Sequence, residues 1–201
     1  MPDLGESEIF YCSLFCRKKY WPEIKADKGQ LARWTSIKER FIDKIRQKEC
    51  DNEAYKWEGK PIPQDGLALY TTINPRCLVR ATHLGVKKLL DLTIRGEKKH
   101  NPHQEILSCI QQAKSRSVFV DFDFDQPEKP VLDGIVNADA VKYLKTRGGW
   151  HVIVELSKVS REFVKTFYMK IQNLGADVSG DCLLPIPGCM SGGYKTPYFL
   201  D

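Results

Sequence analysis

The hydrophobic residues in the first half of the chain predict both helices and a strand. Between residues 31 and 50 they lie three or four positions apart, at Leu31, Trp34, Ile37, Phe41 and Ile45. This spacing predicts an amphipathic helix. Its other face is basic, which indicates either a surface exposed to solvent or a surface that binds the phosphates along a nucleic-acid strand. After a turn-rich segment at 60–66, residues 67–73 predict a strand, and the following residues predict a helix that ends near Gly96.

The second half of the chain has a different pattern. Its predicted elements alternate strand, helix, strand, helix, strand, strand, and lie at residues 118–124, 136–145, 150–156, 160–173, 183–186 and 198–200. This order predicts an α+β fold with an antiparallel sheet and helices on one face, similar to ferredoxin-like or RNA-recognition folds. The polar segment 96–104 separates the halves, so we expect modules 1–105 and 106–201 within one composite domain.

Composition and charge narrow the class of protein. Of the 201 residues, 42% are hydrophobic and 28% are charged, which excludes a disordered or collagen-like polymer. Lys and Arg outnumber Asp and Glu by 31 to 26, which permits an anionic partner without requiring one. No run of about 18 apolar residues occurs, and no signal-like segment opens the chain. We therefore expect a protein of the cytoplasm, or of a nucleoid-associated replication complex, that is not secreted and has no membrane partner.

The most unusual segment is SVFVDFDFD at residues 117–125. On a strand, Asp121, Asp123 and Asp125 share one face, while Phe122 and its apolar neighbours occupy the other. Asp is a poor strand former, and aligned like charges repel. The plain interpretation is a strand with its polar face in water. The alternative is a cation site, and oxygen ligands favour Mg²⁺ or Mn²⁺ over Zn²⁺.

Two later segments carry further candidate chemistry. Arg147, Gly148 and Gly149 predict a tight turn whose backbone N–H groups and charge suit an anion. His151 follows on the next strand and is either a phosphate ligand or a structural histidine. Asp177 lies in a Gly/Ser loop, where an Asp is commonly a turn residue.

These three segments, in this order, resemble the catalytic core of the archaeo-eukaryotic primase superfamily, which includes the primase-polymerases. Asp121 and Asp123 match the first motif of the family, Gly149-Trp150-His151 the second, and Asp177 in GADVSGD the third. The likeness covers residues 117–194, and more loosely TTINPR at 71–76. The sequence departs from the family where the second motif has Gly149 instead of Ser, and where the third-motif loop lacks a basic residue. These departures leave the triphosphate contacts open.

The resemblance implies a two-module core whose C-terminal half is RNA-recognition-like. It also implies a template-dependent nucleotidyltransferase, a DNA primase or primase-polymerase, that extends a 3′-hydroxyl or starts a primer. Asp121, Asp123 and Asp177 would be the catalytic residues and would bind two Mg²⁺ or Mn²⁺ ions. The residues expected to bind the nucleotide are His151, Arg147, Gly148, Gly149 and Arg76.

The expected partners are a single-stranded DNA template with its primer, nucleoside triphosphates, and a helicase or C-terminal helical domain. Arg76 could also contact the template together with Arg80, or both could be ordinary surface arginines. Two alternatives keep part of this hypothesis: a catalytically inactive nucleic-acid-binding replication module, and a metal-dependent nuclease or phosphohydrolase.

A structural zinc site is a lesser possibility. His100, His103 and Cys109 offer three ligands, and Cys12 or Cys16 could supply a fourth. An ordinary polar loop is the preferred interpretation of this segment. The seven cysteines include no Cys-x2-Cys pair, which favours reduced thiols over disulfides.

Overall fold

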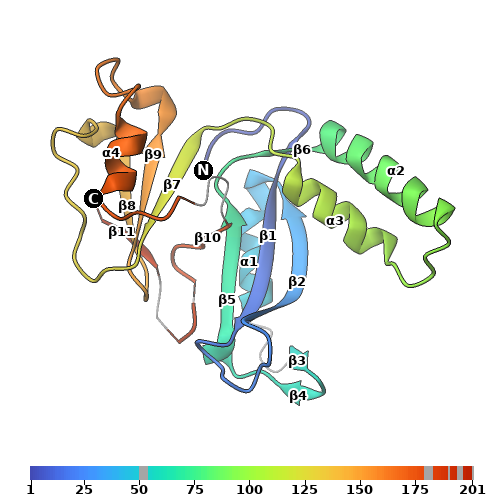
Figure 1. Cartoon of the computed structure of the whole chain (residues 1–201). Helices are drawn as coiled ribbons and strands as arrows, with labels where there is room; N and C mark the ends of the chain where they lie inside the picture. Colours follow the sequence, from blue (N-terminus) through green and yellow to red (C-terminus); the bar gives the residue numbers. More distant parts are fainter. Residues whose placement is uncertain (50–53, 179–182, 190, 194–196, 201) are drawn as a thin grey trace.

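In the part of the chain that the structure describes, the fold is a mixed α+β arrangement of two larger antiparallel sheets and four α-helices (Figure 1). The computed structural model describes residues 1–49, 54–178, 183–189, 191–193 and 197–200. The first sheet has the strand order β10-β5-β1-β2, with β6 also paired to β1, and the second has the order β11-β8-β9-β7. A short hairpin of β3 (Lys56–Trp57) and β4 (Lys60–Pro61) adds a third, two-stranded sheet.

The first sheet is built around β1 (Glu8–Arg17), which pairs on one side with β2 (Lys28–Ser36) and on the other with β5 (Leu67–Thr72). Both faces of β1 are covered, because Phe10 packs with α1 (Phe41–Glu49) whereas Tyr11 packs with α2 (Leu78–Ile94) and α3 (Pro102–Gln112). The remaining members are β6 (Arg76–Cys77) and β10 (Leu183–Pro185).

Helices α2 (Leu78–Ile94) and α3 (Pro102–Gln112) form a hairpin that projects beside the first sheet (Figure 1). Asn101 caps α3 by accepting hydrogen bonds from the backbone N–H groups of His103 and Gln104. Arg33 on β2 donates to the side chains of Gln104 and Ser108, which fixes α3 against the sheet.

The second sheet consists of β7 (Phe119–Phe124), β9 (Trp150–Glu155), β8 (Val141–Lys145) and β11 (Tyr198–Leu200). One face packs against α4 (Phe167–Asn173), where Phe122, Val152 and Ile171 are fully buried. Single 3-10 turns complete the described elements: Lys38–Arg40, Gln64–Gly66, Ala138–Ala140 and Leu156–Lys158.

Three predicted elements differ from the structure. Residues 28–36 form strand β2 instead of the start of a helix, and the helix is confined to α1. Residues 136–145 form a 3-10 turn and strand β8 instead of a helix. The helix expected from residue 160 begins only at Phe167.

The expected α+β class and the strands at 67–73, 118–124 and 150–156 are confirmed within one or two residues. The boundary expected at residue 105 lies within α3, and β10 returns from the second half of the chain to the first sheet. None of the described helices is long and apolar enough to span a membrane.

Candidate active site

The acidic face of β7 lies beside the histidine of β9. The two strands pair antiparallel with Asp123 directly opposite His151 and Phe122 opposite Val152. Because side chains alternate across the pleat, Phe122 points to the α4 side, whereas Asp121, Asp123 and His151 share the other face. The predicted separation of these residues into an apolar and an ionisable face is therefore confirmed.

Asp121 is held by His151. Its carboxylate has no exposed area, and both of its oxygens lie 3.0–3.1 Å from Nδ1 of His151. A carboxylate only accepts hydrogen bonds, so Nδ1–H donates and Nε2 is directed away from Asp121. Burial alone would lower the pKa of His151, but the hydrogen bond to Asp121 and the charges of nearby aspartates raise it above its ordinary value.

Asp123 has a more open position. Its side chain is 44% exposed, and one of its oxygens lies 3.7 Å from Nε2 of His151. Partial burial raises the pKa of Asp123, while the nearby His151 opposes the shift and Asp121 adds to it. The exposed part of the carboxylate can bind a cation from solvent.

Asp177 lies next to Asp123 although the two are far apart in sequence. Each backbone N–H donates to the carbonyl oxygen of the other, at 2.8 and 2.9 Å. Residues paired in this way present their side chains on the same face of a sheet. Asp177 is exposed and therefore extends the ionisable face at its solvent edge. Asp181, the other aspartate of this segment, lies outside the described residues.

The turn before β9 is shaped by glycine. A Cβ on Gly149 would lie 1.9 Å from the carbonyl oxygen of Phe124, so the close approach of the turn to the end of β7 requires glycine. A Cβ on Gly148 would meet the Asp125 carboxylate at an ordinary 3.5 Å. Arg147 is exposed, donates to the carbonyl oxygen of Gly192 and lies over the ring of Tyr20.

A pocket of about 130 Å³ joins these parts. One wall comes from the second sheet and includes Asp123, Asp125, His151 and the Arg147 turn. The opposite wall comes from the end of β1, from the middle of β5 and from the loop after β1, and its residues are Arg17, Lys19, Tyr20 and Tyr70. Sequence reasoning missed this second wall, although the basic and aromatic run at residues 17–20 was a signal for it.

The basic wall is ordered by a hydrogen bond between Arg17 and Tyr70. The guanidinium Nη1 of Arg17 donates to the hydroxyl of Tyr70 at 3.0 Å. Burial would lower the pKa of Arg17, but the nearby Tyr70 and the charge of Asp123 raise it. Arg17 therefore places a fixed positive charge opposite the carboxylates.

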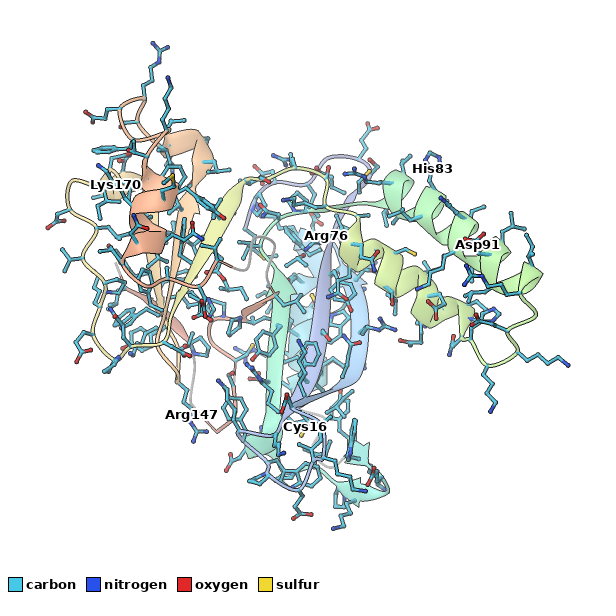
Figure 2. All side chains as sticks on the ribbon, viewed as in Figure 1. Cys16, Arg76, His83, Asp91, Arg147 and Lys170 are labelled. Atoms are coloured by element: carbon cyan, nitrogen blue, oxygen red, sulfur yellow. The ribbon has the colours of Figure 1, made fainter. Side chains whose placement is uncertain are left out.

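Arg76 lies away from this pocket. It is 1% exposed and pairs with Ile9 at the beginning of β1, whereas the pocket lies at Arg17, the end of the same strand. Eight residues of strand correspond to roughly 26 Å, at about 3.3 Å per residue. Figure 2 shows Arg76 toward the upper part of the first sheet and Arg147 near its lower end. We therefore leave Arg76, and with it Arg80, out of the candidate site.

The described residues include no group of three or more His, Cys, Asp or Glu side chains placed to hold a metal ion. The possible zinc ligands are not gathered: Cys109 is buried, whereas His100 is partly exposed and has its Nδ1 at 2.7 Å from the carbonyl oxygen of Glu97. Of the three predicted magnesium ligands, Asp123 and Asp177 fit a hard cation because both are accessible oxygen donors on one face. Asp121 does not fit as placed, since His151 covers its oxygens.

Comparison of the chain with protein-family models, with curated proteins and with solved structures found no match.

Proposed function

We propose that this protein is a template-dependent nucleotidyltransferase, a DNA primase or primase-polymerase that uses Mg²⁺ or Mn²⁺. One observation carries the proposal: Asp123 and His151 lie on one wall of a pocket whose other wall is basic, and Asp177 pairs with Asp123 beside that wall. A nucleoside triphosphate needs both signs of charge, because its phosphates require cationic partners and its metal ions require carboxylates. The order of the three sequence motifs adds independent support.

The residues of the pocket have distinct roles in this proposal. His151, held in orientation by Asp121, directs Nε2 toward the triphosphate, and Arg147 adds a charged donor at the mouth of the pocket. The backbone of Gly148 and Gly149 approaches the phosphates closely because no side chain intervenes. Arg17 faces Asp123 across the pocket. Its positive charge offsets the negative charge that the substrate adds when it enters beside Asp123.

Asp123 and Asp177 would hold the divalent cations, which supply charge neutralisation at the triphosphate and activation of the attacking hydroxyl. Asp121 is a third ligand in the family that the sequence resembles. In the present arrangement it orients His151 instead. The expected partners are single-stranded DNA with a primer and nucleoside triphosphates, together with a helicase or a helical domain.

Two alternatives make different use of the same residues. A nucleic-acid-binding module without catalysis would gain nothing from carboxylates that face phosphate, because they repel it. A nuclease or phosphohydrolase would use the cations in the same way, so the product separates it from a polymerase.

The test is incubation with an unprimed and a primed single-stranded template, labelled nucleotides and Mn²⁺ or Mg²⁺. We expect labelled oligonucleotides with the wild-type protein and at least a 100-fold loss with Asp123→Asn, because loss of one preorganised group that stabilises the transition state costs about 10²–10³ in rate. Asp43→Asn, at an exposed position on α1, is the matched control and should retain the wild-type rate. Shortened template would identify a nuclease, and template binding without any product would identify the binding module.

A further inference from the structure

A second, larger hollow opens beside the pocket. It has a volume of about 380 Å³ and is lined by Arg17, Lys18, Lys19 and Asp27. Arg17 and Lys19 also line the pocket with the carboxylates, so the two spaces are neighbours that share these residues. We call this second space the basic hollow.

The basic hollow is built on an ordered loop. The loop follows β1 and precedes β2, at the lower end of the first sheet in Figure 1. The backbone N–H of Lys18 donates to the carbonyl oxygen of Asp27 at 2.9 Å, which ties the two ends of the loop together. Two residues of the loop itself, Trp21 and Ile24, are buried in a cluster with Cys16 and Ile62 and anchor the loop. The loop therefore holds its lysine side chains outward on a fixed backbone.

The charges of the hollow differ from those of neighbouring lysines. Lys25 and Lys60 form ion pairs with Glu58 and Glu23, at 3.7 and 3.1 Å. By contrast, no carboxylate in the part of the chain that the structure describes lies within ion-pair distance of Lys18 or Lys19. Both side chains are exposed, so their charge is available to an external anion.

We propose that the basic hollow binds backbone phosphates of a single-stranded nucleic acid whose end reaches the carboxylate pocket. This inference rests on the proposed function and extends it by assigning a path to the strand. A free nucleotide fills only one small space, whereas a chain of phosphates can occupy the hollow and continue past Arg17 and Lys19 into the pocket. The cations of the hollow then offset the repulsion between the strand and the aspartates.

The experiment measures binding of a fluorescent single-stranded 20-mer by anisotropy at several salt concentrations, without divalent metal. We expect Lys18→Gln/Lys19→Gln to weaken binding about tenfold. The slope of log affinity against log salt should fall by about 1.4, since each phosphate contact on a single strand contributes about 0.7. Lys98→Gln/Lys99→Gln removes the same charge from the exposed loop between α2 and α3 and should change the affinity less than twofold. An equal loss in both double variants would overturn the proposal.

A second measurement identifies the source of the phosphate. Binding of a labelled nucleoside triphosphate with Mn²⁺ should be changed less than threefold by the single substitution Lys18→Gln, because Lys18 lines the basic hollow and, unlike Lys19, does not line the carboxylate pocket. If this variant loses the nucleotide but retains the 20-mer, the hollow belongs to the triphosphate and the proposed path is wrong. Competition with polyglutamate should displace the 20-mer poorly, and equal displacement would also count against a nucleic-acid site. Because the 20-mer assay involves no catalysis, it stays informative if nucleotide incorporation fails.

Discussion

The two faces of strand β7 lie in opposite environments. On the α4 side, Phe122 and Phe124 are packed in a dry core with Val152 and Val154 of β9. On the other side, Asp121 and Asp123 face His151 and the pocket. Burying a carboxylate without compensation costs free energy, and in this strand the apolar face supplies the cohesion that holds the charged face in place. On this single six-residue strand, one face therefore stabilises the fold and the other carries the candidate chemistry.

The sharpest test of this separation is Phe122→Ala. Phe122 is fully buried and makes edge-on contacts with the rings of Phe167 and Tyr168. Loss of a buried Phe costs about 3–5 kcal/mol through lost transfer energy and a residual cavity. Chemical denaturation should show this decrease in the free energy of unfolding. Phe199→Ala, at a 43% exposed position on β11, is the control and should cost much less; equal losses would remove the distinction between buried and exposed positions.

A smaller effect on stability is expected from Asp121→Asn on the opposite face. The amide keeps the shape and an acceptor for His151, and the cost of the weaker hydrogen bond is offset by the removal of a buried charge. The free energy of unfolding should therefore fall by no more than about 1.5–3 kcal/mol, the range for a hydrogen bond to a charged group, which is less than the loss expected for Phe122→Ala.

The same variant should lose activity. Loss of a group that orients a ligand costs roughly 10–100-fold, so nucleotide incorporation should fall by that factor. Denaturation and the incorporation assay on one preparation measure both quantities. A large loss of stability with unchanged activity would show that Asp121 belongs to the structural side of the strand.

The smallest effect concerns a carboxylate outside both faces. Glu8 on β1 accepts hydrogen bonds from Arg116, at 3.1 and 3.2 Å, just before β7 begins. Arg116 holds the pKa of Glu8 down at about 2, from an ordinary 4.5. The ionised pair therefore stabilises the fold above pH 4.5, and this contribution is lost as the pH falls from 4.5 toward 2.

Glu8→Gln should thus lower the free energy of unfolding by less than about 1 kcal/mol at pH 7. The difference from wild type should shrink as the pH falls through this range. Urea denaturation at pH 7, 4 and 3 checks the trend. A difference that grows toward low pH would contradict the assigned partner.

The sequence predicted an element correctly where the hydrophobic residues of that element keep one regular spacing. The alternation in β7 and β9 predicted their faces correctly because each strand has a single apolar side. The prediction of one helix over residues 31–50 was wrong because Leu31 and Trp34 of β2 pack in the same cluster as Phe41 and Ile45 of α1. Two elements that share one core thus imitate a single amphipathic helix.

The prediction of a helix over residues 136–145 was wrong for a related reason. Val136 and Ala140 are buried before β8 begins, and Leu144 then faces the other side of the sheet, in contact with Ile153 and Ile73. Pairing with β9 determines the conformation of this segment. The run of basic and aromatic residues at 17–20 was visible in the sequence, but its place opposite the carboxylates could not be predicted, because Arg17 and Tyr70 meet the carboxylates only through the packing of one sheet on the other.

The pairing of β10 with β5 has a consequence for how the protein is made. Leu183 and Pro185 line the pocket and join a sheet whose other strands are synthesised much earlier. A nascent chain on the ribosome therefore has the other four strands of that sheet but lacks part of the pocket wall until residue 185 has emerged. Because such long-range pairing slows folding, the candidate active site is completed late in biosynthesis, after most of the surrounding structure can form.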